Sequence, residues 1–248
     1  MSESNTAQRR TPQGTPHQSR TRKIMIFAVL GIIILLTVVA FVPLFYTLFQ
    51  SPGIKTEGID AKGAQPASTD VNGTWEVSRE LGKNATSAGY TFYELLPGDE
   101  RITSGSTQSV KGQLNVENGS LTAGEITVDM ATITSDKDVR DENVRRKILH
   151  TDEYPESKFV LSEPADVTQL PDDGTVGTLT LTGDLTIHGT TKQITQEFNV
   201  LRTGDKVVVA ADVPIKREDY GVESPDFVAA KIADEGEINL RVKFEKRG

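Results

Sequence analysis

The sequence predicts a mainly β protein, either a closed antiparallel barrel or a two-sheet sandwich, with one helical insertion and a single transmembrane helix in front of it. Most of the chain beyond residue 70 alternates apolar and polar residues with the two-residue period of half-buried strands. The stretch 179–200 contains two such strands joined by a turn with a glycine. Residues 24–49 carry no charged side chain and exceed the roughly 20 residues that cross a bilayer.

The N-terminal region is expected to anchor the chain in a membrane. Residues 1–23 are polar and rich in Ser, Thr, Gln, Pro and Arg, which predicts a disordered cytoplasmic tail. Five basic residues precede the apolar stretch and only Lys55 follows closely, so the remainder is expected outside the cytoplasm. The alternative is a long signal peptide that is cleaved near Ala61 or Ala64.

Beyond the apolar stretch, residues 50–70 are rich in Gly, Pro, Ala and Ser and predict a flexible linker, so the folded domain is expected over 71–248. The chain has 27 basic and 35 acidic residues, of which 5 and 1 precede residue 24, leaving a net charge of −12 beyond it. An acidic exported domain argues against nucleic acid as a partner. The absence of cysteine from the sequence excludes disulfides and thiol chemistry.

Nine strands and one helix are expected in the domain. The helix is predicted over 136–149, where acidic residues precede arginines at i,i+4 spacing, as in Asp136 with Arg140. The predicted strands are 74–79, 86–95, 104–117, 121–134, 157–163, 176–187, 192–202, 206–215 and 236–245.

The hairpin at 179–200 allows its register to be predicted. A four-residue turn at 188–191 would place Leu185 opposite Ile194, Leu181 opposite Phe198, and Leu179 opposite Val200. A two-residue turn would instead set Lys192 opposite Leu185, so the four-residue turn fits the apolar pattern better. The other face is Thr, Asp, Lys, Gln and Asn, as expected for a sheet with one face in water. About eight strands can close a barrel whose interior is either filled or encloses one elongated ligand.

Three segments resemble the YceI-like family of polyisoprenoid-binding bacterial envelope proteins. They are DEYPESKF at 152–159, LTIHGTTKQI at 185–194 and REDYGV at 217–222, and the resemblance covers residues 71–248. It implies an extended, eight-stranded, lipocalin-like antiparallel barrel whose hydrophobic tunnel holds an isoprenoid chain, as in a quinone or polyprenyl lipid. It implies neither catalysis nor a cofactor.

Candidate ligand-binding residues follow from the alternation and from the resemblance. Lumen candidates are Phe92, Leu114, Met130, Phe159, Leu181, Leu185, Phe198 and Val209. Mouth candidates, whose phenol or guanidinium groups suit a quinone oxygen or a phosphate, are Tyr154, Arg217 and Tyr220. Ordinary core packing or surface pairing is the competing interpretation of each.

Catalysis and metal binding find little support in the sequence. His150 and His188 follow the apolar stretch but lack a third ligand at zinc-site spacing, and His188 beside Gly189 is typical of a turn. No nucleophile motif is present. The prediction is therefore a membrane-anchored, extracytoplasmic protein that holds an isoprenoid lipid. The alternative is a non-catalytic envelope stress or protein-interaction module with a solid core.

Overall fold

The computed structural model describes residues 17–48, 53–96, 99–223 and 231–247, which fall into two units, residues 1–51 and 52–248. In the first unit, α1 spans His17–Leu48 and includes a 20-residue stretch, Arg22–Phe41, that is long and apolar enough to cross a membrane. The helix begins within the predicted tail, and residues 1–16 of that tail lie outside the described residues.

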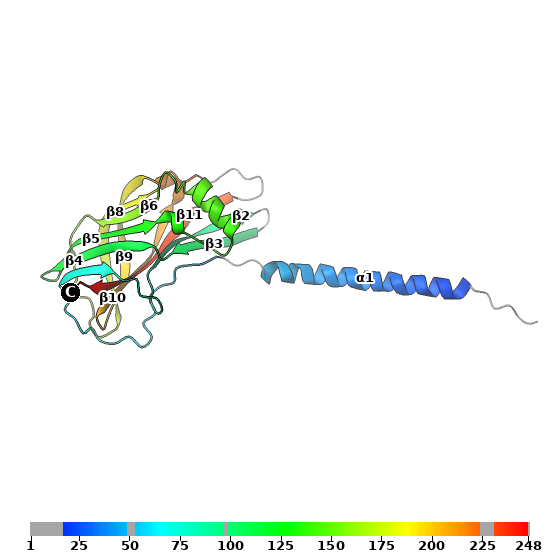
Figure 1. Ribbon diagram of the computed structural model, residues 1–248, viewed down its shortest axis with the longest axis horizontal. Helices are drawn as coiled ribbons and strands as arrows, with labels where there is room; N and C mark the ends of the chain where they lie inside the picture. The colour runs from blue at the N-terminus through cyan, green and yellow to red at the C-terminus, as the bar shows by residue number, and fades with distance from the viewer. Residues whose placement is uncertain (1–16, 49–52, 97–98, 224–230, 248) are drawn as a thin grey trace, which may run out of the picture. The chain divides into compact units, whose positions relative to one another are not determined.

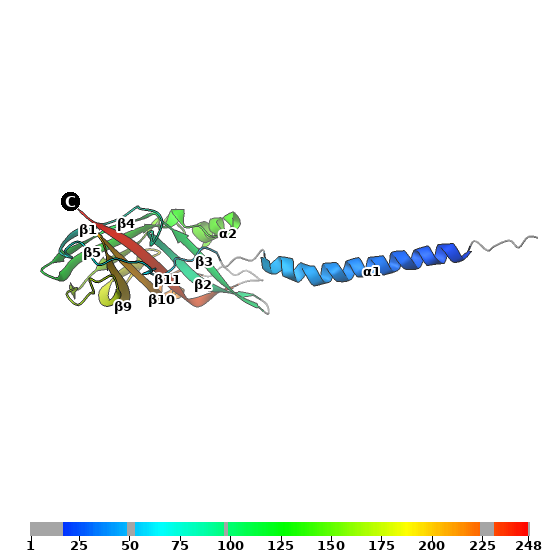
Figure 2. The ribbon, with the colours of Figure 1, turned by 90° about the horizontal axis from the view of Figure 1, so that it is seen from below.

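The second unit is built on a closed barrel of eight antiparallel strands. These are β1 (Gly73–Val77), β4 (Val110–Glu117), β5 (Ser120–Asp129), β6 (Glu156–Leu161), β8 (Val176–Ile187), β9 (Thr190–Thr203), β10 (Lys206–Lys216) and β11 (Lys231–Lys246). They pair in that order, and β11 pairs back with β1 (Figures 1 and 2). The prediction of an eight-stranded antiparallel barrel is confirmed, and the sandwich alternative is excluded.

Two further strands extend the wall of the barrel. β2 (Ser87–Leu96) pairs with the first part of β11, and β3 (Asp99–Thr107) pairs with β2. The prediction of one strand over 104–117 is wrong, because the chain changes partners between Thr107 and Val110. The Thr107 hydroxyl accepts a hydrogen bond from the Ser109 amide at 3.0 Å and supports this bend. A short β7 (Ala165–Asp166) pairs with the start of β5.

Helical turns lie at one end of the barrel. α2 (Asp138–Asn143) continues into a π-helical turn, Val144–Ile148, and lies at the end opposite the C-terminus (Figure 1). The predicted helix is therefore present, with an α-helical part of six residues. Short 3-10 turns follow β5 (Met130–Thr132) and β10 (Arg217–Tyr220).

The predicted register of the β8–β9 hairpin is wrong. The turn contains only His188 and Gly189, so Leu185 pairs with Lys192 and Leu181 with Gln196. Both turn residues have positive φ, 50° and 72°, as a two-residue type I′ turn requires. Glycines on β8 oppose large side chains on β9, with Gly183 facing Ile194, and Gly177 facing Val200. Complementary size, rather than apolar side chains in direct opposition, therefore fixes the register.

Of the flexible linker predicted over 50–70, residues 50–52 lie outside the described residues, and residues 53–70 run along the barrel. Thr56 and Ser87 share a hydrogen bond of 2.7 Å between their hydroxyls, and the amide of Ser68 donates to the Gly204 carbonyl at 2.7 Å. Asn84 binds both backbone groups of Asp60, at 2.8 and 3.0 Å. We call residues 53–70 the strap. It is held by backbone and side-chain hydrogen bonds that its composition does not reveal.

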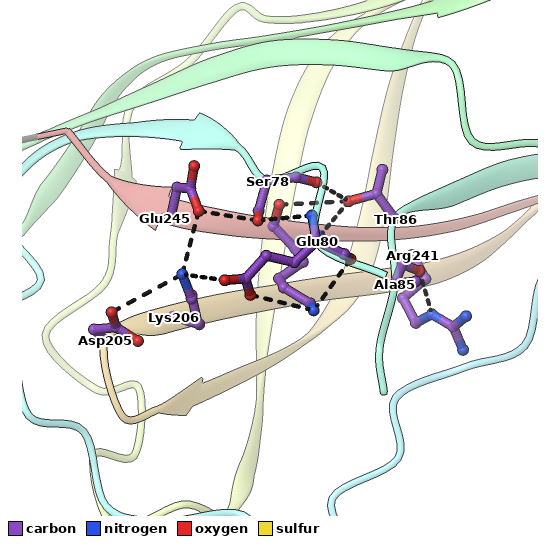
Figure 3. Close-up of polar contacts among 9 residues, drawn as sticks. Ser78, Glu80, Ala85, Thr86, Asp205, Lys206, Arg241 and Glu245 are labelled. Atoms are coloured by element: carbon purple, nitrogen blue, oxygen red, sulfur yellow. Dashed lines mark hydrogen bonds and ion pairs between the residues drawn. The ribbon is translucent and has the colours of Figure 1, made fainter. Parts of the chain in front are cut away.

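A polar cluster joins β10 and β11 to the segment that follows β1, near the C-terminal end of the barrel (Figure 3). The ammonium of Lys206 lies 3.2 Å from the Glu245 carboxylate and 3.5 Å from that of Glu80, and Ser78 donates to Glu245 at 3.0 Å. Hydrogen bonds from Lys206 and Ser78 lower the pKa of Glu245. Through the Ser78–Glu245 hydrogen bond the cluster links β11 to the end of β1, the two strands whose pairing closes the barrel.

Candidate functional site

The barrel contains a partly open cavity of about 450 Å³, a volume typical of sites for small ligands. Its wall consists mainly of inward-facing apolar side chains of β2, β5, β6, β8, β9, β10 and β11, together with residues of α2. The alternation in the strand predicted over 121–134 agrees with this, because Ile126, Val128 and Met130 all line the inner face. We call this space the main cavity.

A second cavity of about 70 Å³ lies deeper in the barrel and is lined only by apolar side chains and a glycine. The chain's single tryptophan, Trp75, lines it together with Phe244. Four residues line both cavities, namely Ile126, Phe159, Phe198 and Leu240. They therefore form a partition across the lumen.

The predicted lumen residues divide between the two cavities. Phe92, Met130, Phe159, Leu185 and Phe198 line the main cavity. Leu114, Leu181 and Val209 line the second cavity, with the two partition phenylalanines. All eight side chains thus face the interior, while their role in ligand binding stays a prediction.

The three predicted mouth residues do not share one site: only one of them lines a cavity. Arg217 lines the main cavity and is held in place by hydrogen bonds to the Val222 carbonyl, at 2.9 Å, and to Asp234. Tyr154 and Tyr220 line neither cavity. Tyr220 is buried in a small core cluster with Leu185 and Val222, where burial raises the pKa of its phenol.

Five basic side chains and one acidic side chain border the main cavity. The basic residues are Lys137, Arg140, Lys158, Arg217 and Lys231, and the acidic residue is Glu94. Arg140 pairs with Asp136 and, at 3.9 Å, with Glu94. Lys137 and Lys231 form no ion pair within the described residues. Lys158 pairs with Glu156 at 3.2 Å, and Arg217 pairs with Asp234, so the uncompensated positive charge at the border is that of Lys137 and Lys231.

Tyr90 is a cavity residue that sequence reasoning missed. It lines the main cavity, and burial in this apolar site strongly raises the pKa of its phenol. Its hydroxyl has no hydrogen-bond partner among the described residues. The sequence does indicate that Tyr90 faces the lumen, because Tyr90 and the predicted lumen residue Phe92 are two residues apart and so lie on the same face of their strand. Arg140 and Val144 were missed because helix placement over the barrel end depends on tertiary packing.

The two histidines lie close together beside the hairpin turn. The His188 ring is 5.6 Å from the His150 ring and 4.3 Å from the Tyr154 ring, measured between centroids. Burial, and then the nearby His150, lower the pKa of His188. Within the described residues no group of three His, Cys, Asp or Glu side chains is placed to hold a metal ion.

Comparisons with known proteins match the barrel. The family model described as the YceI-like domain matches residues 81–244. The structure of BcnA from Burkholderia cenocepacia is 20% identical, with a TM-score of 0.52, covering 64% of this chain and 94% of that one. A polyisoprenoid binding domain from Saccharophagus degradans, implicated in plant cell wall breakdown, is 16% identical, with a TM-score of 0.50, covering 66% and 99%. No curated protein matches the chain in sequence.

Proposed function

Because the chain belongs to the YceI-like domain family, we propose that it is a lipid-binding protein that holds one isoprenoid lipid, of quinone or polyprenyl type, in its barrel. The observation that carries the proposal is the apolar main cavity of about 450 Å³ inside a closed barrel. The polyisoprenoid binding named for the Saccharophagus degradans domain supports the choice of lipid. Sequestration, transport and presentation of the lipid all use this same site.

The hydrocarbon would supply most of the affinity. Transfer of a chain from water to an apolar lumen is favourable by about 0.8 kcal/mol for each buried CH₂ group. Few polar groups face the interior, so little desolvation opposes entry of such a chain. A fixed barrel wall also limits the entropy that binding removes from the protein.

The polar head group would lie among the basic residues at the border of the main cavity. Arg217 keeps the mouth role predicted from the sequence, and Arg140, Lys137 and Lys231 join it. Guanidinium and ammonium groups donate hydrogen bonds to phosphate or to a quinone oxygen. The Tyr90 hydroxyl offers one more donor inside the cavity. Tyr154 and Tyr220 would support the border from behind rather than touch the ligand.

We infer further that the protein is anchored in a membrane by α1, with the barrel on the outer side. The apolar stretch of α1 and the basic residues before it support this arrangement. Such a protein would exchange its lipid close to a bilayer surface and would not diffuse freely.

Co-purified lipid tests the proposed function. The full chain in a mild detergent should release an isoprenoid into organic solvent, identified by mass spectrometry, and should take up quinones or polyprenyl phosphates afterwards. Ala88→Phe places a ring in the main cavity and should reduce uptake at least tenfold. Ala123→Phe makes the same change at an exposed position of the wall and should leave uptake unaltered. A folded wild-type protein that carries no lipid and takes up none would overturn the proposal in favour of a protein-interaction module.

A further inference from the structure

We propose that the Phe159–Phe198 ring pair sets the length of hydrocarbon that the barrel accepts, at about three isoprene units. The inference rests on the proposed lipid binding and adds the chain length of the ligand to it. The two rings are 5.9 Å apart between centroids, with planes inclined by 52°. With Ile126 and Leu240, they are the residues that the main and second cavities share.

The ring of Phe159 is fixed by its neighbours. It lies against Gly183 on β8, where a Cβ atom would come within 2.4 Å of the ring carbon Cζ. The strand pairing places Phe159 between Ile126 of β5 and Leu185 of β8. The missing side chain at position 183 therefore admits the ring, and the flanking strands hold it in place.

Phe198 closes the partition from another strand. It lies on β9, is only 3% exposed, and pairs with Leu179. β8 separates β6 from β9, so the two rings approach each other across this strand, with 5.9 Å between their centroids. Because protein interiors are close-packed, a chain can pass this point only if a ring moves.

The volumes of the two cavities give the number of hydrocarbon carbons that each can hold. A water molecule takes up about 30 Å³ in the liquid, and a methylene group is about as large. The main cavity of about 450 Å³ thus holds about 15 carbon atoms, or three isoprene units, and the second cavity of about 70 Å³ adds about two. In a longer isoprenoid the surplus carbons would stay outside the main cavity.

A series of prenyl alcohols measures the limit on the full-length protein. Affinity should rise about fourfold with each methylene buried, up to the 15-carbon farnesol. It should then stay level for the 20-carbon and 40-carbon alcohols. The emission of Trp75 should not change on binding, because this residue lines only the second cavity.

Substitutions at matched phenylalanines test the partition itself. Phe198→Leu should make the 20-carbon alcohol bind at least tenfold more tightly than farnesol and should shift the Trp75 emission. Phe244→Leu enlarges only the second cavity, and Phe92→Leu only the main cavity, so neither should shift the emission when ligand binds.

Two results on the wild-type chain keep the inference separate from the proposed function. Affinity that continues to rise to the 40-carbon alcohol, or a Trp75 shift with that ligand, would overturn the length limit while lipid binding stands. A wild-type protein that binds none of the alcohols would overturn lipid binding, and the length limit with it.

Discussion

At the scale of single residues, His188 combines a backbone role with a titratable ring. Its φ of 50° is one that Asn also adopts readily, and Asn-Gly is a favoured pair for a type I′ turn. Burial and the neighbouring His150 lower the pKa of the ring. The folded protein therefore binds the proton less readily than the unfolded chain does.

This difference predicts a pH dependence of stability. Between the lowered pKa and the unfolded value of about 6.5, the unfolded state binds more protons, so the free energy of unfolding falls as pH decreases through this window. His188→Asn should keep the turn and make this decline shallower. Urea unfolding of both proteins at pH 7.5 and 5.0 measures the difference, and equal declines would contradict the prediction.

At the scale of elements, the sequence predicts where strands form better than it predicts which residues pair between them. The limits of β8 agree with the prediction at both ends, because the alternation of Leu and Thr is regular there. The β8–β9 register does not agree, because Gly183 and Gly177 accept the bulky side chains opposite them. A prediction that places apolar side chains opposite one another does not find pairs of a glycine with a large side chain. The path of the strap depends on hydrogen bonds to partners that are distant in the sequence, such as Ser87 for Thr56 and Gly204 for Ser68, which no local pattern in the strap specifies.

The strap provides a prediction at the same scale. Asn84→Gly keeps the positive φ of 51° but removes both hydrogen bonds to Asp60, each worth about 1 kcal/mol. Amide hydrogen exchange near residue 60 should become at least tenfold faster, while exchange in the barrel strands stays unchanged. Asn118→Gly is a matched control, since Asn118 has a φ of 52° but is exposed in the β4–β5 turn. Equal exchange in the two variants would show that the Asn84 bonds do not hold the strap.

At the scale of the whole molecule, barrel closure follows from the count of alternating strands, but the shape of the lumen does not. The partition uses Ile126, Phe159, Phe198 and Leu240, which come from β5, β6, β9 and β11. The alternation indicates that each of these side chains points inward. Their convergence at one depth depends on the stagger of the strands around the barrel, which no local pattern encodes.

The orientation of the chain across a membrane is the corresponding whole-molecule prediction. The natural sequence has no cysteine, so a single introduced thiol reports its own location without background. In cells with a sealed cytoplasmic membrane, Ser109→Cys, at an exposed position of the barrel, should react with an impermeant maleimide. Ser4→Cys should react only after lysis, because the basic residues retain the N-terminus inside. The reverse labelling pattern would place the barrel in the cytoplasm, where it could draw its lipid only from the inner leaflet.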